Sequence, residues 1–215
     1  DLTPIINVAF IPSVLVVPAD SPYKNLAALI TAAKPTKNEV SFGSCGNGTP
    51  QHLAGAILNI NAKTNITHIP YGGCGPALRD VLGGQIPMAI ITASSAAAQI
   101  KAGKLIALAI TSAERTLQLP NIPTVAEQGY PGYQMNQWHG LLVPADTPVA
   151  LQAKLYERLL KIVQLPEVKE KLVEKLNFQK WLPEISKVYH LLGDSFVLLS
   201  IECPICHGSS WDENK

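Results

Sequence analysis

Charged residues are scarce in this sequence, and neither sign dominates. Of its 215 residues, 15% are charged, and the formal net charge is +1. This balance provides no basic surface for nucleic acid, so we expect no nucleic-acid partner. Apolar residues reach 47%, but proline and glycine divide them into short runs. Because a membrane span needs roughly 20 consecutive apolar residues, we expect no direct insertion into a membrane.

Cysteine is scarce too. The four cysteines, at positions 45, 74, 203 and 206, do not form the pattern of a disulfide framework, and they indicate no particular redox compartment. The chain begins Asp1-Leu2-Thr3-Pro4, without the positive and apolar segments of a signal peptide. We therefore expect no signal peptide within this sequence.

Short β-rich runs alternate with helical ones along most of the chain. The patterns predict strands over 14–17, 40–43, 66–69, 88–91, 105–110 and 140–143. They predict helices over 26–33, 50–61, 76–82, 95–102, 124–128, 149–163 and 167–176. This alternation predicts an α/β fold with a mostly parallel sheet flanked by helices. The loops at 43–49, 70–75 and 92–95 each follow a strand, so we expect them to share one sheet edge, where such folds bind ligands.

The stretch 42–52 combines glycines and hydroxyls with the start of a helix. Thr49 suits the N-cap, and the proline after it suits the first helical position. Gly46 and Gly48 allow positive φ and leave backbone amides open. Amides at the positive end of a helix favour a carboxylate or phosphate. The donors that we expect are the amides around Asn47 to Thr49 and the hydroxyls of Ser44 and Thr49. An ordinary strand-to-helix turn with a good cap is the alternative interpretation.

Further candidate ligand residues lie on the neighbouring segments. Tyr71 and Gly72 belong to the second glycine-rich loop, and the tyrosine offers a ring and a hydroxyl to a small organic acid. Thr92 supplies a hydroxyl after a third strand, and Trp138 stands where the chain enters another strand. His52 lies in the first helical turn after the loop, where it can donate to an anion or act as a base. The alternatives are a core role for Tyr71 and Trp138, a helix cap next to Thr92, and a surface or boundary position for His52.

Two other chemistries stay open at this stage. Cys45 and His52 together suggest a cysteine hydrolase, because a helix N-terminus lowers the pKa of a nearby thiol. No third orienting group accompanies them. In the tail, Cys203, Cys206 and His207 match the Cys-x-x-Cys-His pattern of covalent haem attachment, or half of a zinc site. We interpret this tail match as a chance one, and we expect no cofactor and no resident metal ion.

A set of motifs in fixed order resembles one family. The motifs are Ser21-Pro22-Tyr23-Lys24, the stretch 42–55, Pro70-Tyr71-Gly72-Gly73, Gly83-Gly84-Gln85, the stretches 100–105 and 119–127, and Trp138-His139-Gly140-Leu141-Leu142-Val143-Pro144. Together they resemble the substrate-binding receptors of tripartite tricarboxylate transporters, the Bug family. The resemblance covers residues 1 to about 178 without large gaps. Each motif is weak alone, but the ordered set is specific.

The resemblance implies a periplasmic binding protein of type II, in which two α/β lobes close on a small carboxylate. It implies delivery of that acid to membrane transporter subunits and no enzymatic reaction. The positions matching Ser44 to Thr49 and His52 would line one half of the cleft, with Tyr71, Gly72 and Thr92 near it. Trp138 would lie close to the crossover between lobes. The family holds its acid through amides, hydroxyls and water, and neither glycine-rich loop contains an arginine or a lysine.

The resemblance also predicts the domain organisation. Residues 1–7 would be a crossover segment, 8–130 the second ligand-binding lobe, 131–178 a remnant of the first lobe, and 179–215 an atypical tail. Family members begin with a further segment of about a hundred residues that this chain lacks. We therefore expect an N-terminally truncated receptor with part of its cleft missing, which would impair binding.

Overall fold

The longest element of the structure is the strand β1 (Leu2–Pro18), which spans 17 residues. The structure is a computed structural model that describes residues 1–34, 40–168 and 170–171. The strand predicted over 14–17 is the inner end of β1, and all four of its side chains are fully buried. A strand buried on both faces is a continuous apolar run, which is what the sequence shows at this point.

Five strands form the main sheet, in the order β3-β2-β4-β1-β5. The shorter strands are β2 (Ser41–Ser44), β3 (Thr67–Pro70), β4 (Ala89–Thr92) and β5 (Leu105–Ile110). β2 is parallel to β3 and β4, whereas β1 is antiparallel to β4 and β5. β2, β3, β4 and β5 therefore run in one direction and β1 runs against them. The α/β fold class is confirmed, with a mixed sheet.

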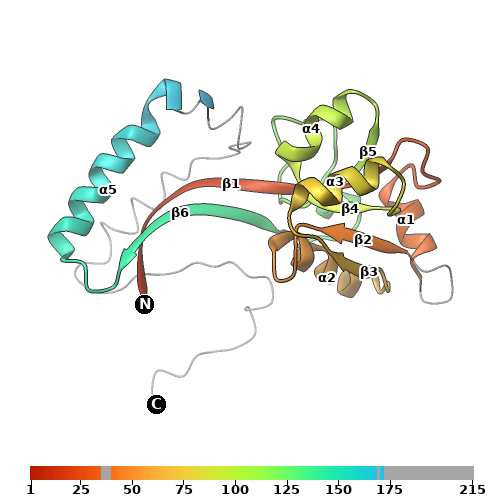
Figure 1. The fold of residues 1–215 in the computed structure, drawn as a ribbon, viewed down its shortest axis with the longest axis horizontal. Coiled ribbons are helices and arrows are strands. Elements are labelled where there is room, and N and C mark those ends of the chain that lie inside the picture. The colour runs from red at the N-terminus through yellow and green to blue at the C-terminus, as the bar shows by residue number, and fades with distance from the viewer. Residues whose placement is uncertain (35–39, 169, 172–215) are drawn as a thin grey trace, which may run out of the picture. The chain divides into compact units, whose positions relative to one another are not determined.

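Helices cover both faces of this sheet (Figure 1). They are α1 (Leu26–Ala32) and α2 (Pro50–Ala62) on one face, and α3 (Cys74–Leu82) and α4 (Ala93–Lys101) on the other. Side chains of β1 alternate between the two cores: Leu15 and Val17 pack with α1 and α2, and Val14 and Val16 pack with α3 and α4. The sheet therefore fixes where each following loop emerges.

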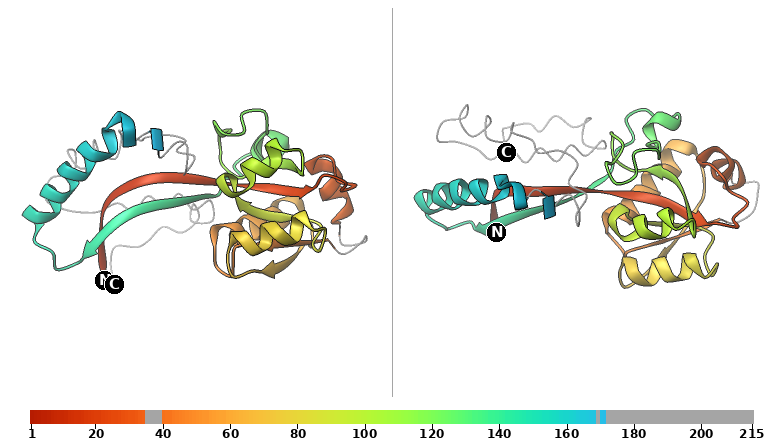
Figure 2. Two further views of the ribbon diagram at one scale, coloured as in Figure 1. Left: turned by 45° about the horizontal axis from the view of Figure 1, so that its top comes forward. Right: turned by 90° about the horizontal axis from the view of Figure 1, so that it is seen from above.

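The outer half of β1 belongs to a second, smaller core. β6 (Asn136–Pro144) pairs antiparallel with residues 2–12 of β1, and the two strands lie side by side in both views of Figure 2. The helix α5 (Val149–Gln164) packs there, and Ile5, Ile6 and Val163 are buried between these elements. The domain boundary expected between residues 7 and 8 falls inside β1.

Shorter and later elements complete the description. The helix predicted over 124–128 is a single 3-10 turn, η1 (Ala126–Gln128). The helix predicted over 167–176 lies largely outside the described residues, and so does the whole tail 179–215 with Cys203, Cys206 and His207. Among the helices that the structure describes, none is both long enough and apolar enough to cross a membrane.

Candidate functional site

The turn between β2 and α2 has the shape that its sequence predicts. Thr49 is the N-cap of α2, and its hydroxyl accepts a hydrogen bond from the His52 N–H at 3.4 Å. Gly46 has a φ of 139°, which other residues rarely adopt. A Cβ added to Gly46 would lie 3.2 Å from the carbonyl oxygen of Tyr71. The β2–α2 loop, residues 44–49, thus requires glycine both for its path and for its closeness to the next loop.

Hydrogen bonds inside the β2–α2 loop occupy several of the predicted donors. The Ser44 hydroxyl accepts from the Gly46 N–H at 3.1 Å, and the Thr49 hydroxyl donates to the Gly46 carbonyl at 2.7 Å. The Gly48 N–H donates to Nδ1 of His52 at 3.1 Å. An anion that binds the Gly48 N–H must therefore replace its bond to His52, which is the most exposed of these bonds.

A second histidine, His68 on β3, lies against this loop. Its ring stacks on that of His52, with centroids 3.8 Å apart and an interplanar angle of 10°. Its Nε2 lies 2.7 Å from the hydroxyl oxygen of Ser44, and its ring also meets Phe42 at a centroid distance of 5.1 Å. Burial, and secondarily the charge of His52, lowers the pKa of His68 below its ordinary value. The neutral imidazole is thus the favoured form of His68.

The β3–α3 loop, residues 70–75, is joined directly to the first loop. The Tyr71 N–H donates to the Ser44 carbonyl at 3.3 Å, and a disulfide links Cys45 to Cys74. The sequence showed no pattern of a disulfide framework, so this pairing was not predicted. The cysteine hydrolase hypothesis is contradicted, because a sulfur held in a disulfide has no thiolate to act as a nucleophile.

Tyr71 contributes its ring to this region more than its hydroxyl. The hydroxyl donates to Oδ2 of Asp80 at 2.8 Å. Burial, together with this hydrogen bond and the charge of Asp80, raises the pKa of Tyr71 to about 12. The predicted ligand residues Asn47 and Gly72 are exposed, one in each loop. These positions are open to a ligand, whereas the Tyr71 hydroxyl is already bound.

Hydroxyl side chains continue along the same edge of the sheet. Ser44 ends β2 and Thr92 ends β4, and Ser13 of β1 lies opposite Thr92. Thr111 follows β5, and its hydroxyl accepts from the Ser13 N–H at 2.9 Å. The hydroxyl oxygen of Thr92 lies 2.7 Å from that of Ser95. The structure therefore places Thr92 on the predicted edge, where it bonds to α4 rather than to the β2–α2 loop.

A buried polar network links α2 to β6. Gln51 is fully buried, and its Nε2 donates to the Ser13 hydroxyl at 2.9 Å and to Oε1 of Gln137 at 3.2 Å. Trp138, the next residue on β6, pairs with Phe10 and is 51% exposed. Trp138 is therefore exposed on β6, the strand that Gln51 of α2 contacts through Gln137.

Sequence reasoning missed several polar residues of this edge, namely Ser13, Gln51, His68, Thr111 and Gln137. For His68 a signal was available. The strands predicted over 40–43 and 66–69 are parallel neighbours, and Phe42 lies opposite His68 in that ladder. Because these two strands are parallel neighbours, His68 lies beside the start of the β2–α2 loop.

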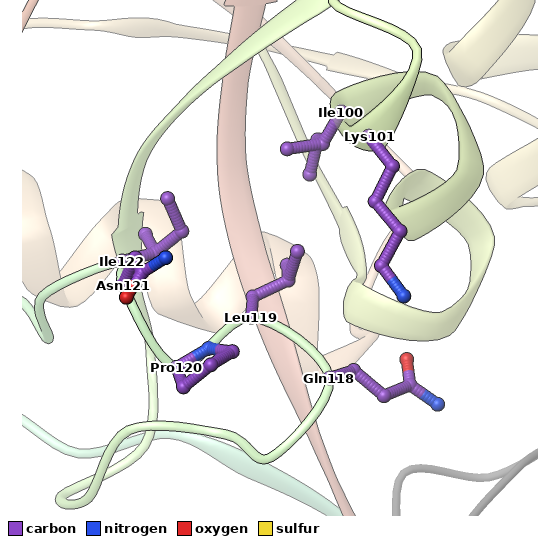
Figure 3. Close-up of a pocket in the computed structure, with 7 residues that line it drawn as sticks. All are labelled: Ile100, Lys101, Gln118, Leu119, Pro120, Asn121 and Ile122. Atoms are coloured by element: carbon purple, nitrogen blue, oxygen red, sulfur yellow. The ribbon is translucent and has the colours of Figure 1, made fainter.

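The structure also contains a hollow away from these loops. Figure 3 shows that it lies between the end of α4 and the loop before η1, and its volume is about 270 Å³. Its lining is mainly apolar, with one ammonium group; the lining residues are Ile100, Lys101, Gln118, Leu119, Pro120, Asn121 and Ile122. No sequence-predicted ligand residue lines it. Among the described residues, no group of three or more metal-ligating side chains is present.

Comparisons with known families, sequences and structures agree on one protein family. The model of the family described as "Tripartite tricarboxylate transporter family receptor" matches residues 1–197. A protein encoded in the tcbD-tcbE intergenic region of Pseudomonas sp. (strain P51) is 39% identical over 173 residues, which cover 80% of this chain and 52% of that protein. The chain therefore spans about half the length of the curated relatives that it matches.

Two solved structures are similar over most of the described chain. One is the structure of R. palustris Rpa4515 with adipate. It shares 28% identity at a TM-score of 0.75, over 88% of this chain and 64% of that one. The other is the periplasmic binding protein BugD, with 31% identity and a TM-score of 0.71, over 83% of this chain and 59% of that one. This chain therefore resembles both proteins in sequence as well as in fold.

Proposed function

Because this chain belongs to the tripartite tricarboxylate transporter receptor family, we propose that it supplies one ligand-binding lobe of an extracytoplasmic receptor for small carboxylates. The receptor would capture an organic acid and present it to membrane transporter subunits, and it would make or break no bond in that acid. Residues 8–130 would form this lobe and 131–178 part of the other. The similar structure of R. palustris Rpa4515 with adipate supports a carboxylate as the ligand.

The observation that carries this proposal is the meeting of two glycine-rich loops at one sheet edge. The β2–α2 and β3–α3 loops touch through the Tyr71–Ser44 backbone bond and the disulfide. Their exposed donors are uncharged, and several converging amides hold an anion without an arginine. The ligand-binding residues that we propose are Ser44, Gly46, Asn47, Gly48, Thr49, His52, Tyr71, Gly72, Thr92 and Trp138. Tyr71 would contribute its ring, since its hydroxyl is bound to Asp80.

An oxidising compartment suits this chain. The Cys45–Cys74 disulfide is of a kind that persists in the periplasm and outside the cell, and that the cytosol keeps reduced. The similar protein BugD is itself periplasmic. We therefore place the receptor in the periplasm, facing the transporter subunits.

Calorimetric titration with malate, succinate, adipate and benzoate tests the proposal. We expect at least one of these acids to bind with a stoichiometry of about one, the single anion position that one helix start provides. Heats no larger than dilution for all four acids, from protein shown to be folded by circular dichroism, would contradict the proposed function.

A matched pair of glycine variants locates the site. Gly48 and Gly103 have φ values of 71° and 69°, and a Cβ would touch nothing at either position. Left-handed backbone costs a non-glycine residue roughly 1–2 kcal/mol, so both alanine variants should lose similar stability. Gly48→Ala strains the backbone of the β2–α2 loop, and a loop that relaxes to another path must return to the original one to bind the acid. The affinity for the acid should therefore fall about tenfold. Gly103→Ala should keep wild-type affinity.

A further inference from the structure

Two histidines, His52 and His68, stack on each other beside the β2–α2 loop. Nδ1 of His52 accepts the Gly48 N–H, so this nitrogen carries no proton. The ring of His68 lies 3.8 Å away and parallel, and its Nε2 is held by Ser44. The pair therefore presents a lone pair, rather than a proton, toward the loop that we propose to bind acids.

A carboxylate that approaches this position meets an obstacle. The Gly48 N–H points at Nδ1 of His52, and that lone pair repels a carboxylate oxygen. A proton added to Nδ1 changes both groups at once. The imidazolium becomes a donor, and the Gly48 N–H is released to donate as well. Two adjacent donors, one of them charged, then face the anion, and charge-assisted bonds of this kind are the strong ones.

The second ring restricts the pair to one proton. Two imidazolium rings at this distance would repel each other, whereas a neutral ring stacked on a cationic one attracts it. Protonating His52 costs only its bond from Gly48, which the anion replaces. His68 stays neutral, since burial already disfavours its charged form and Ser44 fixes its orientation.

Among the described residues, neither histidine ring is hydrogen-bonded to another ionisable side chain. Ser44 and Phe42 face His68 from β2, and His52 faces it from α2. The other ionisable groups on the packed elements are Tyr71 and Asp80, which are hydrogen-bonded to each other, Arg79 in the last turn of α3, and Lys63, which caps the far end of α2. The loop's own chemistry thus leaves the histidine pair as the source of positive charge.

We propose that His52 and His68 act as one proton-accepting pair, so that the β2–α2 loop binds a carboxylate together with one proton on Nδ1 of His52. His52 touches the acid, and His68 is a positioning residue that acts through it. The proposal rests on the proposed function and adds to it the protonation state that the site requires. Affinity should fall about tenfold per pH unit where the free pair is neutral, because one proton is bound with each acid.

Calorimetry in two buffers measures this proton directly. Malate, succinate, adipate and benzoate are titrated at pH 7.5 in HEPES and in Tris, whose ionisation enthalpies differ, and the difference in heat gives the protons taken up. We expect about one proton per acid bound at pH 7.5. Uptake should decrease as the pH is lowered, because a free pair that already holds a proton takes up none on binding.

Three variants assign the proton. His52→Asn should abolish uptake and make the affinity independent of pH. His68→Asn should lower uptake at pH 7.5 by removing the stacked ring that stabilises the cation. His139→Asn changes an exposed histidine on β6 and should keep wild-type uptake. If a variant fails to fold, the wild-type measurement still decides the question.

The outcomes separate the two proposals. Binding of any of the four acids without proton uptake at pH 7.5, or with uptake unchanged in folded His52→Asn, overturns the proton-accepting pair and leaves the receptor function standing. Absence of binding by all four acids overturns the receptor function and the pair with it.

Discussion

The bond between Cys45 and Cys74 joins the two loops of the candidate site, and its removal should cost stability and affinity together. It links residues 29 apart in sequence. In the chain-entropy account, a crosslink that closes a loop of this length stabilises the folded state by about 3–4 kcal/mol at 25 °C. Both cysteines also pack against the core formed by β4, α3 and α4, so the lost side-chain contacts act in the same direction.

Urea denaturation of Cys45→Ala/Cys74→Ala against wild-type protein measures this cost. We expect a free energy of unfolding lower by about 3–4 kcal/mol, and a weaker titration with whichever acid the wild type binds, because nothing then fixes the spacing of the two loops. Wild-type protein under reducing conditions should behave like the double variant. Cys203→Ser/Cys206→Ser, treated in the same way, shows whether the tail thiols contribute.

A thiol count gives the sharpest refutation. In Cys203→Ser/Cys206→Ser protein, purified without reductant and denatured, the two remaining cysteines should give no reaction with a thiol reagent. Two reactive thiols per chain would contradict the disulfide. A stability difference below about 1 kcal/mol would contradict the magnitude, since disulfides typically contribute about 2–4 kcal/mol.

Three further predictions follow from single contacts. Gly55→Ala should lower the free energy of unfolding, measured in urea, by about 1–2 kcal/mol, because its Cβ would overlap the buried ring of Phe42. The higher helix propensity of alanine offsets only part of that cost. Adding Phe42→Leu to the same chain should restore part of the lost stability. Tyr71→Phe should cost about 1 kcal/mol through the lost bond to Asp80, yet leave acid affinity within about twofold, which calorimetry checks. His68 has a lowered pKa in the folded state. The unfolded chain therefore binds more protons than the folded chain as pH falls below about 6.5, and wild-type stability drops there. His68→Asn should show a shallower drop in stability between pH 7 and 5, and the same slope as wild type above pH 7.

The loops of the fold were predictable because their signals are local. Thr49 and the proline after it mark the start of α2, and the strand before them ends within one residue of its predicted end. The shared edge of the loops follows from the parallel arrangement of β2, β3 and β4. Helix caps and strand ends depend on a few neighbouring residues, so they can be predicted from a single sequence.

The rest depends on contacts between distant residues. β1 extends to Leu2 because β6 pairs with it, although Pro4 and Pro12 interrupt the apolar pattern in this part of the sequence. The Cys45–Cys74 bond and the stacking of His52 on His68 require two loops to meet, which the spacing of the residues does not reveal. The binding of the Tyr71 hydroxyl to Asp80 likewise depends on the orientation of α3.

A crystal structure of this chain grown with the acid that gives the largest calorimetric heat tests the central claim most directly. The account predicts a carboxylate oxygen within hydrogen-bond distance of the Gly48 amide nitrogen and of Nδ1 of His52, at the start of α2. A carboxylate bound instead in the hollow beside Lys101, with the β2–α2 loop unchanged, would contradict it.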